Sequence, residues 1–530
     1  MENKLRPVWV IILLLSGILI GLYINKGVNK RKIEFEGGSK FDEVMWHVGN
    51  DYVEKPDVQK LQDEAIAAMM EELDPHSDYI SLDEFNEVND PLLGSFDGIG
   101  VQFRLEKDTI AIVSVIKGGP SEKVGLLAGD RIVYVDDTLV AGKKLKNEDV
   151  MRKLKGPKGT KVGVRVMRRG VEGLLDYTIT RDAIPTYSVD IAYMLDEKTG
   201  YLKLSKFSAT TASEFRNALI NLEAQCMKQL VLDLRGNTGG YLSAAVDVAD
   251  EFLPKGSLIV YTEGRNRPRQ YLKARRRGML EDIPVVVLID GESASASEIV
   301  AGALQDNDRG TIVGRRSFGK GLVQEQIMLS DQSAIRLSVA RYYTPTGRCI
   351  QKPYDEDHEK YLLESYERYE NGELFHPDSI HFADSLKFTT PKGKTVYGGG
   401  GIMPDIYVPL VDDSTEYYFN RIVNTGLLYQ YAFEYTDKHR AQLQRYQSVE
   451  AFDRSFAVSD AMFNELAKSA EGKGIKGTDE QKQVARREAN TLLKAYIARN
   501  LFDDEGFYPI YAPMEEILQR ALEELQTSVW

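Results

Sequence analysis

Residues 284–299, which read PVVVLIDGESASASEI, decide the fold of this chain. The five apolar residues before Asp290 are typical of a strand buried on both faces, and the small residues after it predict a tight turn into a helix. Comparable strand-like runs at 230–234 and 335–340 alternate with helical patterns. The region 184–350 is therefore predicted to form an α/β core.

The turn in this stretch carries three serines. At a strand-to-helix turn a serine hydroxyl can point into a cleft, and the backbone N–H groups at the start of the helix favour a developing oxyanion. Serines at such positions are also ordinary helix caps. The turn by itself therefore does not identify a nucleophile.

A nucleophilic serine needs a base, and the six histidines all lie outside this stretch and its neighbouring strands. A lysine can serve instead if burial keeps its amine neutral. The sequence SFGKGLVQ at 317–324 sets Lys320 between two glycines and puts Gln324 on the same strand face, where its amide could orient the amine. A lysine between glycines is more often a solvated loop residue, so this motif is also ambiguous alone.

A third motif, VLDLRGNTGG at 231–240, is a strand that ends in a glycine turn before a helix predicted to begin near Tyr241. Such a turn can contribute a backbone N–H to an oxyanion hole. It is equally compatible with a plain strand-to-helix connection.

Two stretches further upstream indicate a separate β-rich module, in which β-type runs at 109–115 and 131–135 predict strands and residues 147–154 predict a helix. The sequence GIGV, formed by Gly98, Ile99, Gly100 and Val101, lets backbone N–H groups converge on an anion such as a carboxylate. Residues 120–132 follow as a short helical turn and a Gly-Asp turn that feeds a strand. Together they resemble a PDZ domain over about 95–181, which implies that a substrate's C-terminal strand adds to a sheet edge while its carboxylate meets the glycine loop.

The three core motifs together resemble the C-terminal processing proteases, or tail-specific proteases, whose pattern is DLRxNxGG, SASASE and FGKGxVQ. Further matches are LDPHS at 73–77 and GGGIMPD at 399–405, while Thr238 stands where the family often has proline. The resemblance covers about 41–409. It implies a multidomain α/β protein with a crotonase-like or ClpP-like peptidase core, an inserted PDZ domain and a helical region at each end.

The same resemblance implies a serine endopeptidase that recognises protein C-termini. The nucleophile would be Ser295, the base Lys320, and Gln324 would complete the arrangement. The oxyanion donors would be the backbone N–H of Ala296 and that of Gly239 or Gly240, a choice that stays open. No metal or organic cofactor would be required.

The predicted organisation has five parts: a membrane anchor at 1–32, a helical region at 33–92, the PDZ domain at 93–182, the peptidase core at 183–410 and a helical extension at 411–530. A surface insertion is predicted within the core at about 355–390. Neither the insertion nor the extension has a counterpart in the family pattern, so their roles stay open.

The N-terminal residues 8–24 are uncharged and apolar. As a helix they would span about 25 Å, somewhat less than a hydrocarbon core of about 30 Å. No small-x-small cleavage site follows, which favours an uncleaved anchor over a signal peptide. Basic residues flanking the run argue against export of the C-terminal bulk, but the catalytic resemblance favours an inner-membrane anchor with the peptidase in the periplasm.

Charge and composition limit the partners. With 67 Lys and Arg against 80 Asp and Glu, the net charge is −13, which opposes nucleic-acid binding, and the basic run at 265–277 is interpreted as a solvated loop. Cys226 and Cys349 are predicted to be free thiols. The expected partners are proteins with accessible C-terminal tails and the membrane, and assembly into a homo-oligomer is left open.

Two other functions compete with the peptidase. A membrane-tethered PDZ scaffold with a silent core would bind tails without cutting them, but it has no physical need for Ser295, Lys320 and Gln324. A different hydrolase with a crotonase-type core would explain the glycine turns and leave the PDZ-like module unexplained.

Overall fold

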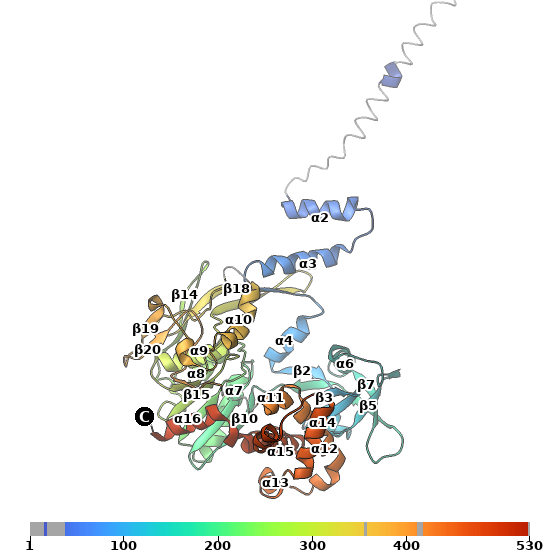
Figure 1. Cartoon of the computed structure of the whole chain (residues 1–530). Helices are drawn as coiled ribbons and strands as arrows, with labels where there is room; N and C mark the ends of the chain where they lie inside the picture. The colour runs from blue at the N-terminus through green and yellow to red at the C-terminus, as the bar shows by residue number, and fades with distance from the viewer. Residues whose placement is uncertain (1–14, 19–37, 355–357, 411–416, 528–530) are drawn as a thin grey trace, which may run out of the picture. The chain divides into compact units, whose positions relative to one another are not determined.

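The computed structural model describes residues 15–18, 38–354, 358–410 and 417–527 (Figure 1). The chain divides into two compact units, Met1–Met70 and Glu71–Trp530. The first contains α2 (Lys40–Asp51), which Ser39 caps, and α3 (Val58–Glu71). In the described part of the chain no helix combines the length and apolarity needed to cross a membrane. Most of the predicted anchor segment, 8–24, lies outside the described residues.

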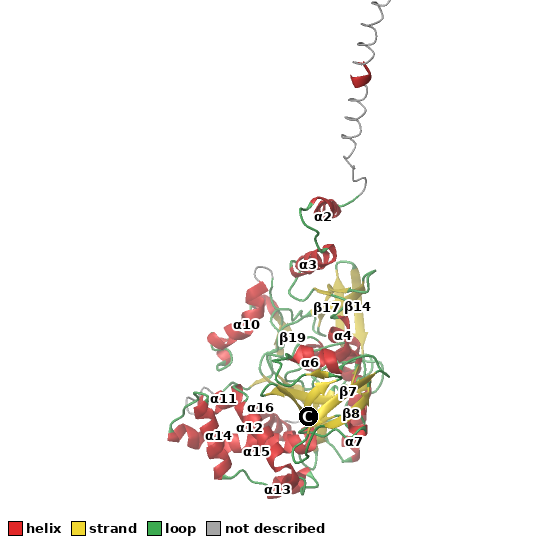
Figure 2. Cartoon of the chain, turned by 90° about the vertical axis from the view of Figure 1, so that its right-hand side faces the viewer, coloured by secondary structure: helices red, strands yellow, loops and turns green. Residues whose placement is uncertain are grey.

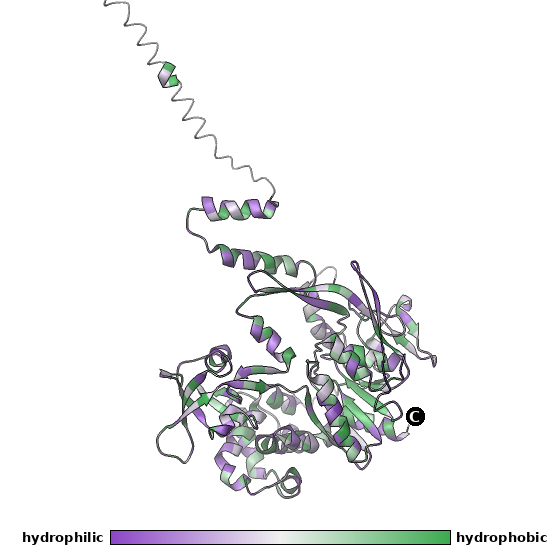
Figure 3. Ribbon diagram, turned by 180° about the vertical axis from the view of Figure 1, so that it is seen from behind, coloured by the Kyte–Doolittle hydropathy of each residue, from purple (hydrophilic) through white to green (hydrophobic). Residues whose placement is uncertain are grey.

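The second unit is built on a six-stranded sheet in which all neighbouring strands are parallel except β10 and β11. Figure 3 shows apolar residues along its strands. The strands are apolar because both faces of a parallel sheet are covered. The α/β core is confirmed, and the predicted strand at 285–289 has those bounds. In pairing order the strands are β10 (Val189–Met194), β11 (Thr199–Leu204), β12 (Gln229–Asp233), β15 (Val285–Ile289), β16 (Thr311–Gly314) and β21 (Ile406–Tyr407).

Alternating side chains of this sheet pack against different helices. Leu232 and Val287 face the helices α7 (Thr211–Ala224), α8 (Leu242–Ala249) and α9 (Ala296–Asp306). Val231 and Val286 point to the other face and pack against α16 (Glu516–Thr527). The predicted C-terminal extension therefore completes the core of the peptidase domain, since one of its helices covers a face of the sheet.

A second, antiparallel sheet carries the lysine motif at its edge. Residues 267–273 of the basic run belong to it as a strand of a hairpin, so the expected loop was wrong, whereas the expected solvent exposure of the run is confirmed. Its arginines are paired with acids, for example Arg267 with Glu325 at 2.7 Å and Arg269 with Glu263 at 2.7 Å. The strands are β1 (Asp78–Ile80), β18 (Ala334–Tyr343), β13 (Leu258–Gly264) and β14 (Arg267–Lys273), with β17 (Leu322–Met328) also paired to β18.

The PDZ-like module has its own six-stranded sheet and its own core, which includes Ile112, Ile132 and Val164. Its strands β7 and β8 are yellow in Figure 2. The predicted strands at 109–115 and 131–135 and the predicted helix at 147–154 have those bounds. The elements are β3 (Val101–Glu106), β4 (Thr109–Val115), α5 (Pro120–Lys123), β5 (Arg131–Val135), β6 (Thr138–Leu139), α6 (Asn147–Leu154), β7 (Lys161–Met167) and β8 (Leu175–Thr180).

The module is inserted through a pair of short strands. After α4 (Phe85–Leu93), β2 (Ser95–Gly98) leads into the module and pairs antiparallel with β9 (Asp182–Pro185), which leads out of it. The paired strands bring the two ends of the insertion together, as a domain inserted into another fold requires.

The helical extension predicted at 411–530 is confirmed for 417–527 (red helices in Figure 2). It contacts the PDZ-like module, where Arg131 lies 3.2 Å from Asp437 and the Arg104 guanidinium stands 4.7 Å from the centre of the Phe433 ring. Before α16 its helices are α11 (Tyr417–Asn424), α12 (Leu427–Leu443), α13 (Val449–Ser455), α14 (Asp460–Gly472) and α15 (Asp479–Tyr511).

The segment predicted as a surface insertion at 355–390 is not confined to the surface. Its helix α10 (His358–Glu370) buries Tyr361 and Arg368. Arg368 donates a hydrogen bond of 2.9 Å to the carbonyl oxygen of Ser317, in the lysine motif. The charged and Tyr-rich composition suggested solvent exposure, and most of the described segment is exposed or half-buried, but these two side chains pack into the core. The short hairpin β19 (Lys387–Thr389) and β20 (Thr395–Tyr397) follows.

Both cysteines are free thiols, as predicted. Cys226 is exposed and Cys349 is partly buried. Burial raises the pKa of the Cys349 thiol, so less of it is in the reactive thiolate form at neutral pH.

Candidate active site

Ser295 stands at the turn between β15 and α9 with φ of 54° and ψ of −109°. This backbone conformation is strained for a residue with a side chain and persists only where neighbours hold it. Its N–H donates to Glu298 Oε2 at 2.8 Å, and its carbonyl oxygen lies 3.1 Å from the hydroxyl of Tyr342. The turn is thus fixed from both sides.

Glu298 connects the serine turn to the lysine motif. Its carboxylate is fully buried and accepts four hydrogen bonds, two from Ser295 N and Lys320 N and two from the Ser317 hydroxyl and Gly319 N. Burial raises the pKa of Glu298, against the effect of these donors. Tyr342 adds a second connection, since its hydroxyl donates to the Lys320 carbonyl oxygen at 2.8 Å and lies 3.1 Å from that of Ser295.

Neither of these residues was named as a site residue from the sequence. A helix whose cap is a serine with glutamate three residues later has the capping-box signature, which could have identified Glu298. No sequence signal marks Tyr342, because its contact with the turn depends on the packing of β18 against α9.

Lys320 donates from Nζ to Gln324 Oε1 at 3.0 Å. The pKa of Lys320 is lowered, first by burial and then by the positive charge of Arg336. Across the described residues no hydrogen bond joins Lys320 Nζ to the Ser295 hydroxyl. Such contacts often form only when substrate is bound.

The LDPHS segment at 73–77 orients Gln324. The Gln324 amide nitrogen donates to the carbonyl oxygen of His76, which leaves Oε1 to accept from Lys320. Asp74 Oδ1 in turn accepts from the backbone N–H of His76 and of Ser77, each at 2.9 Å. The segment therefore positions the Lys320 amine indirectly, through the side-chain amide of Gln324.

The side chain of His76 is not suited to act as the base. Its Nε2 lies 2.6 Å from the Tyr361 hydroxyl, and its ring packs edge-on against Phe318. Burial, followed by the charge of Lys320, lowers the pKa of His76 to about 4, so the ring is neutral at physiological pH. Its role near the lysine is one of packing and support.

The glycine turn at 236–240 lies directly against Ser295. A Cβ added to Gly239, whose φ is 105°, would come within 2.8 Å of the Ser295 Cβ atom. The Gly239 N–H donates to Asn237 Oδ1 at 2.9 Å, whereas in the described ranges the N–H groups of Ala296 and Gly240 have no hydrogen-bond partner. Ala296 and Gly240 thus retain free donors in the two turns that meet at Ser295.

The structure brings the three core motifs together. The Asn237 carbonyl oxygen accepts from the N–H of Ala294 at 3.0 Å and from the Ser297 hydroxyl at 2.8 Å, which joins the glycine turn to the serine turn. Glu298 joins the serine turn to the lysine motif. Among the described residues there is no group of three or more His, Cys, Asp or Glu side chains that could hold a metal ion.

The GIGV loop lies apart from these motifs, in the PDZ-like module. It borders a groove of about 390 Å³ whose other wall is α6. The Ser121 hydroxyl fixes the loop by donating to the Ile99 carbonyl oxygen at 2.6 Å. The groove is lined by Phe96, Gly98, Ile99, Gly100, Val101, Gln102, Phe103, Asn147, Met151, Leu154 and Lys155.

Comparison with known proteins agrees with this arrangement. Residues 198–359 match the model of peptidase family S41, residues 98–179 match the PDZ domain, and residues 418–503 match a family of unknown function (DUF8443). The carboxy-terminal-processing protease of Bartonella bacilliformis is 39% identical over 342 residues, which cover 64% of this chain and 78% of the relative. Carboxy-terminal processing protease CtpA of Bacillus subtilis is 35% identical over 359 residues, 66% of this chain and 76% of the relative.

The fold and the site define a serine-type endopeptidase with an S41 core and a PDZ domain. More narrowly, the chain belongs to the family of carboxy-terminal processing proteases. The predicted family, fold class and enzyme class are confirmed. The peptidase is thereby favoured over the silent scaffold.

Proposed function

We propose that this endopeptidase cleaves with Ser295 as nucleophile and Lys320 as general base, with Gln324 as the residue that orients the base. The observation that carries the proposal is the largely buried amine of Lys320, which hydrogen-bonds to a neutral amide, while the backbone N–H of Lys320 is joined through Glu298 to the strained serine turn. The lowered pKa of Lys320 favours the neutral amine, the form that can accept a proton.

In the proposed reaction, the Lys320 amine turns from Gln324 towards Ser295 and takes the hydroxyl proton as Oγ attacks the scissile carbonyl carbon. The N–H groups of Ala296 and Gly240 stabilise the oxyanion. The protonated Lys320 then gives the proton to the leaving amine as the C–N bond breaks. Water, with Lys320 again as base, hydrolyses the acyl-enzyme and restores the serine.

We further propose that the substrate is a protein with a free C-terminus whose last residue is apolar. The apolar groove between β3 and α6 can accept an added strand, and the glycine loop can receive its carboxylate. Ile99, Met151 and Leu154 line the groove where the last side chain would lie. The PDZ domain would thus select the tail and the core would cut.

Amidation of the C-terminus of an unstructured substrate should reduce kcat/KM by about tenfold or more, because a charged hydrogen bond contributes roughly 1.5–3 kcal/mol. Met151→Glu, which puts a negative charge into the groove, should have a similar effect. Met167→Glu provides the control, since Met167 is exposed on β7. Equal cleavage of the free and amidated substrates would contradict tail selection while leaving the catalytic proposal intact.

We also propose that residues 8–24 anchor the protein in the cytoplasmic membrane with the peptidase outside the cytoplasm. The uncharged run supports this proposal. The full chain should pellet with membranes, resist high salt and dissolve in detergent, whereas a chain lacking residues 2–32 should be recovered without detergent. Release of the full chain by salt alone would refute the anchor.

A further inference from the structure

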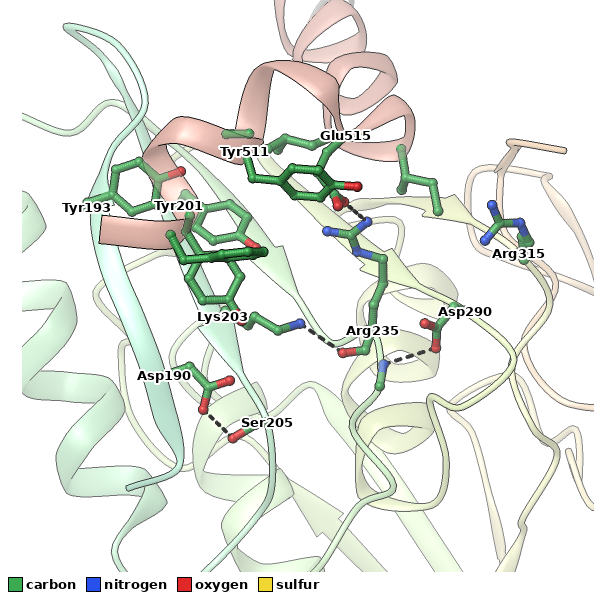
Figure 4. A pocket seen from close by; sticks show the side chains of 16 residues that line it. Asp190, Tyr193, Tyr201, Lys203, Ser205, Arg235, Asp290, Arg315, Tyr511 and Glu515 are labelled. Carbon is green, nitrogen blue, oxygen red and sulfur yellow. Dashed lines mark hydrogen bonds and ion pairs between the residues drawn. The ribbon is translucent and has the colours of Figure 1, made fainter. Parts of the chain in front are cut away.

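A cavity of about 450 Å³ lies on the face of the six-stranded sheet that α16 covers (Figure 4). Three of its lining residues, Arg235, Asp290 and Arg315, lie within two residues of the carboxyl ends of the parallel strands β12, β15 and β16. Ligands of open α/β sheets bind outside the carboxyl ends of the strands, and cavities of this size hold small molecules. Ser295 is not among the residues that line it.

One end of the cavity contains an unpaired cation. The partly buried guanidinium of Arg315 has no hydrogen-bond or ion-pair partner among the described residues, and its Nε atom is buried. Arg235 differs, since it pairs with both Asp233 and Glu515. Burial lowers the pKa of Arg315. Keeping such a cation without a partner costs stability, which a bound anion would restore.

Tyrosines line the other side of the cavity. The rings of Tyr193 and Tyr201 lie 5.4 Å apart, and that of Tyr508 lies 6.3 Å from Tyr201. The Tyr193 hydroxyl is buried and has no hydrogen-bond partner in the described chain. In Figure 4, Tyr193 and Arg315 lie at opposite sides of the view. The cavity therefore offers a cation on one side, an aromatic wall and a free hydroxyl on the other.

The walls of the cavity also hold the backbone of the active site. Lys203 Nζ donates to the Arg235 carbonyl oxygen at 2.9 Å. Asp290 Oδ1 accepts from the N–H of Gly236 and of Ser293, each at 3.1 Å. These residues begin the glycine turn and the serine turn, so an occupant of the cavity would contact the supports of both.

We propose that this cavity is a binding site for a carboxylate that carries an apolar or aromatic body, with Arg315 as the partner of the carboxylate, and that its occupancy modulates turnover. The ligand could be a free organic acid or the C-terminal residue of a released peptide, which share this chemistry. The binding itself does not depend on which residues catalyse cleavage.

The test compares 3-phenylpropionate with 3-phenylpropanamide, its uncharged analogue, by calorimetric titration and thermal unfolding of the full chain in detergent. The acid should bind at least about tenfold more tightly than the amide and raise Tm, because only the acid pairs with Arg315. Saturating acid should change kcat for an unstructured substrate. Equal binding of acid and amide, or binding of neither, would overturn the proposal.

Arg315→Met should abolish acid binding and raise the Tm of the free protein, because it removes an unpaired cation. A purely structural arginine would lower Tm instead. Arg277→Met is the control, since Arg277 is exposed and pairs with Asp282, and it should bind the acid normally. If Arg315→Met does not fold, Tyr193→Phe should keep the fold and weaken binding severalfold; unchanged binding in both variants contradicts the site.

The two ligand sources are separated with acetyl-Ala-Phe, measured in Met151→Glu protein to exclude binding in the PDZ groove. Tighter binding than 3-phenylpropionate, lost in Arg315→Met, would identify a peptide terminus as the ligand. Weaker binding than 3-phenylpropionate would identify a free organic acid. Each outcome supports the carboxylate site and distinguishes its source.

Discussion

Ser295→Ala should reduce cleavage of an unstructured protein by about ten-thousand-fold or more, since loss of a nucleophile removes the covalent route. The fold should be kept, because hydrogen bonds to the backbone N–H and carbonyl oxygen of this residue hold the turn, and only the contribution of its side chain to the capping box of α9 is lost. Ser295→Gly should be equally inactive and more stable by about 1 kcal/mol, because glycine tolerates φ of 54°. Gel-based cleavage assays and thermal unfolding provide the two measurements.

Ser297→Ala is the matched control within the same motif. The Ser297 hydroxyl donates to the Asn237 carbonyl oxygen, so its loss should destabilise the turn and lower activity without abolishing it. If Ser295→Ala retained activity within about tenfold of wild type while Ser297→Ala was inactive, the assignment of the nucleophile would be wrong.

Lys320→Ala should cause a loss similar to that of Ser295→Ala, and the double variant should lose little more, because the two residues act in one step. In the wild type, kcat/KM should rise with pH and level off above the pKa of Lys320, since the base acts only when neutral. The midpoint should lie below the ordinary lysine pKa, because burial and Arg336 favour the neutral amine. A pH series of initial rates measures both.

Arg336→Gln tests the cause of this shift. Removing the positive charge that disfavours the protonated lysine should raise the pKa of Lys320 and move the acidic limb of the profile to higher pH. Arg341→Gln on the same strand is the control, because Arg341 does not contribute to the Lys320 shift. An acidic limb that moves equally in both variants, or in neither, would contradict the electrostatic explanation.

Local patterns predicted much of the fold. The apolar run before Asp290 is typical of a strand buried on both faces, and β15 has the predicted bounds. The bounds of β4, β5 and α6 also agree with local sequence patterns. The three core motifs could be identified because each is a contiguous stretch in which the backbone geometry requires particular residue types. At position 239, for example, only glycine fits so close to Ser295. Composition misled at one residue of α10, since Arg368 is buried against the lysine motif although most charged residues of this helix are exposed.

By itself the sequence determined the α/β core, the PDZ-like module, the helical extension and the residues proposed for catalysis, because these depend on periodicity and contiguous motifs. Packing settles which glycine keeps a free N–H, how His76 fixes Gln324 across 248 positions of the chain, and that Arg315 lacks a partner among the described residues. Hydrogen bonds and burial between distant segments arise from packing, and no local pattern encodes them. The same packing lowers the pKa of Lys320, on which the proposed chemistry depends.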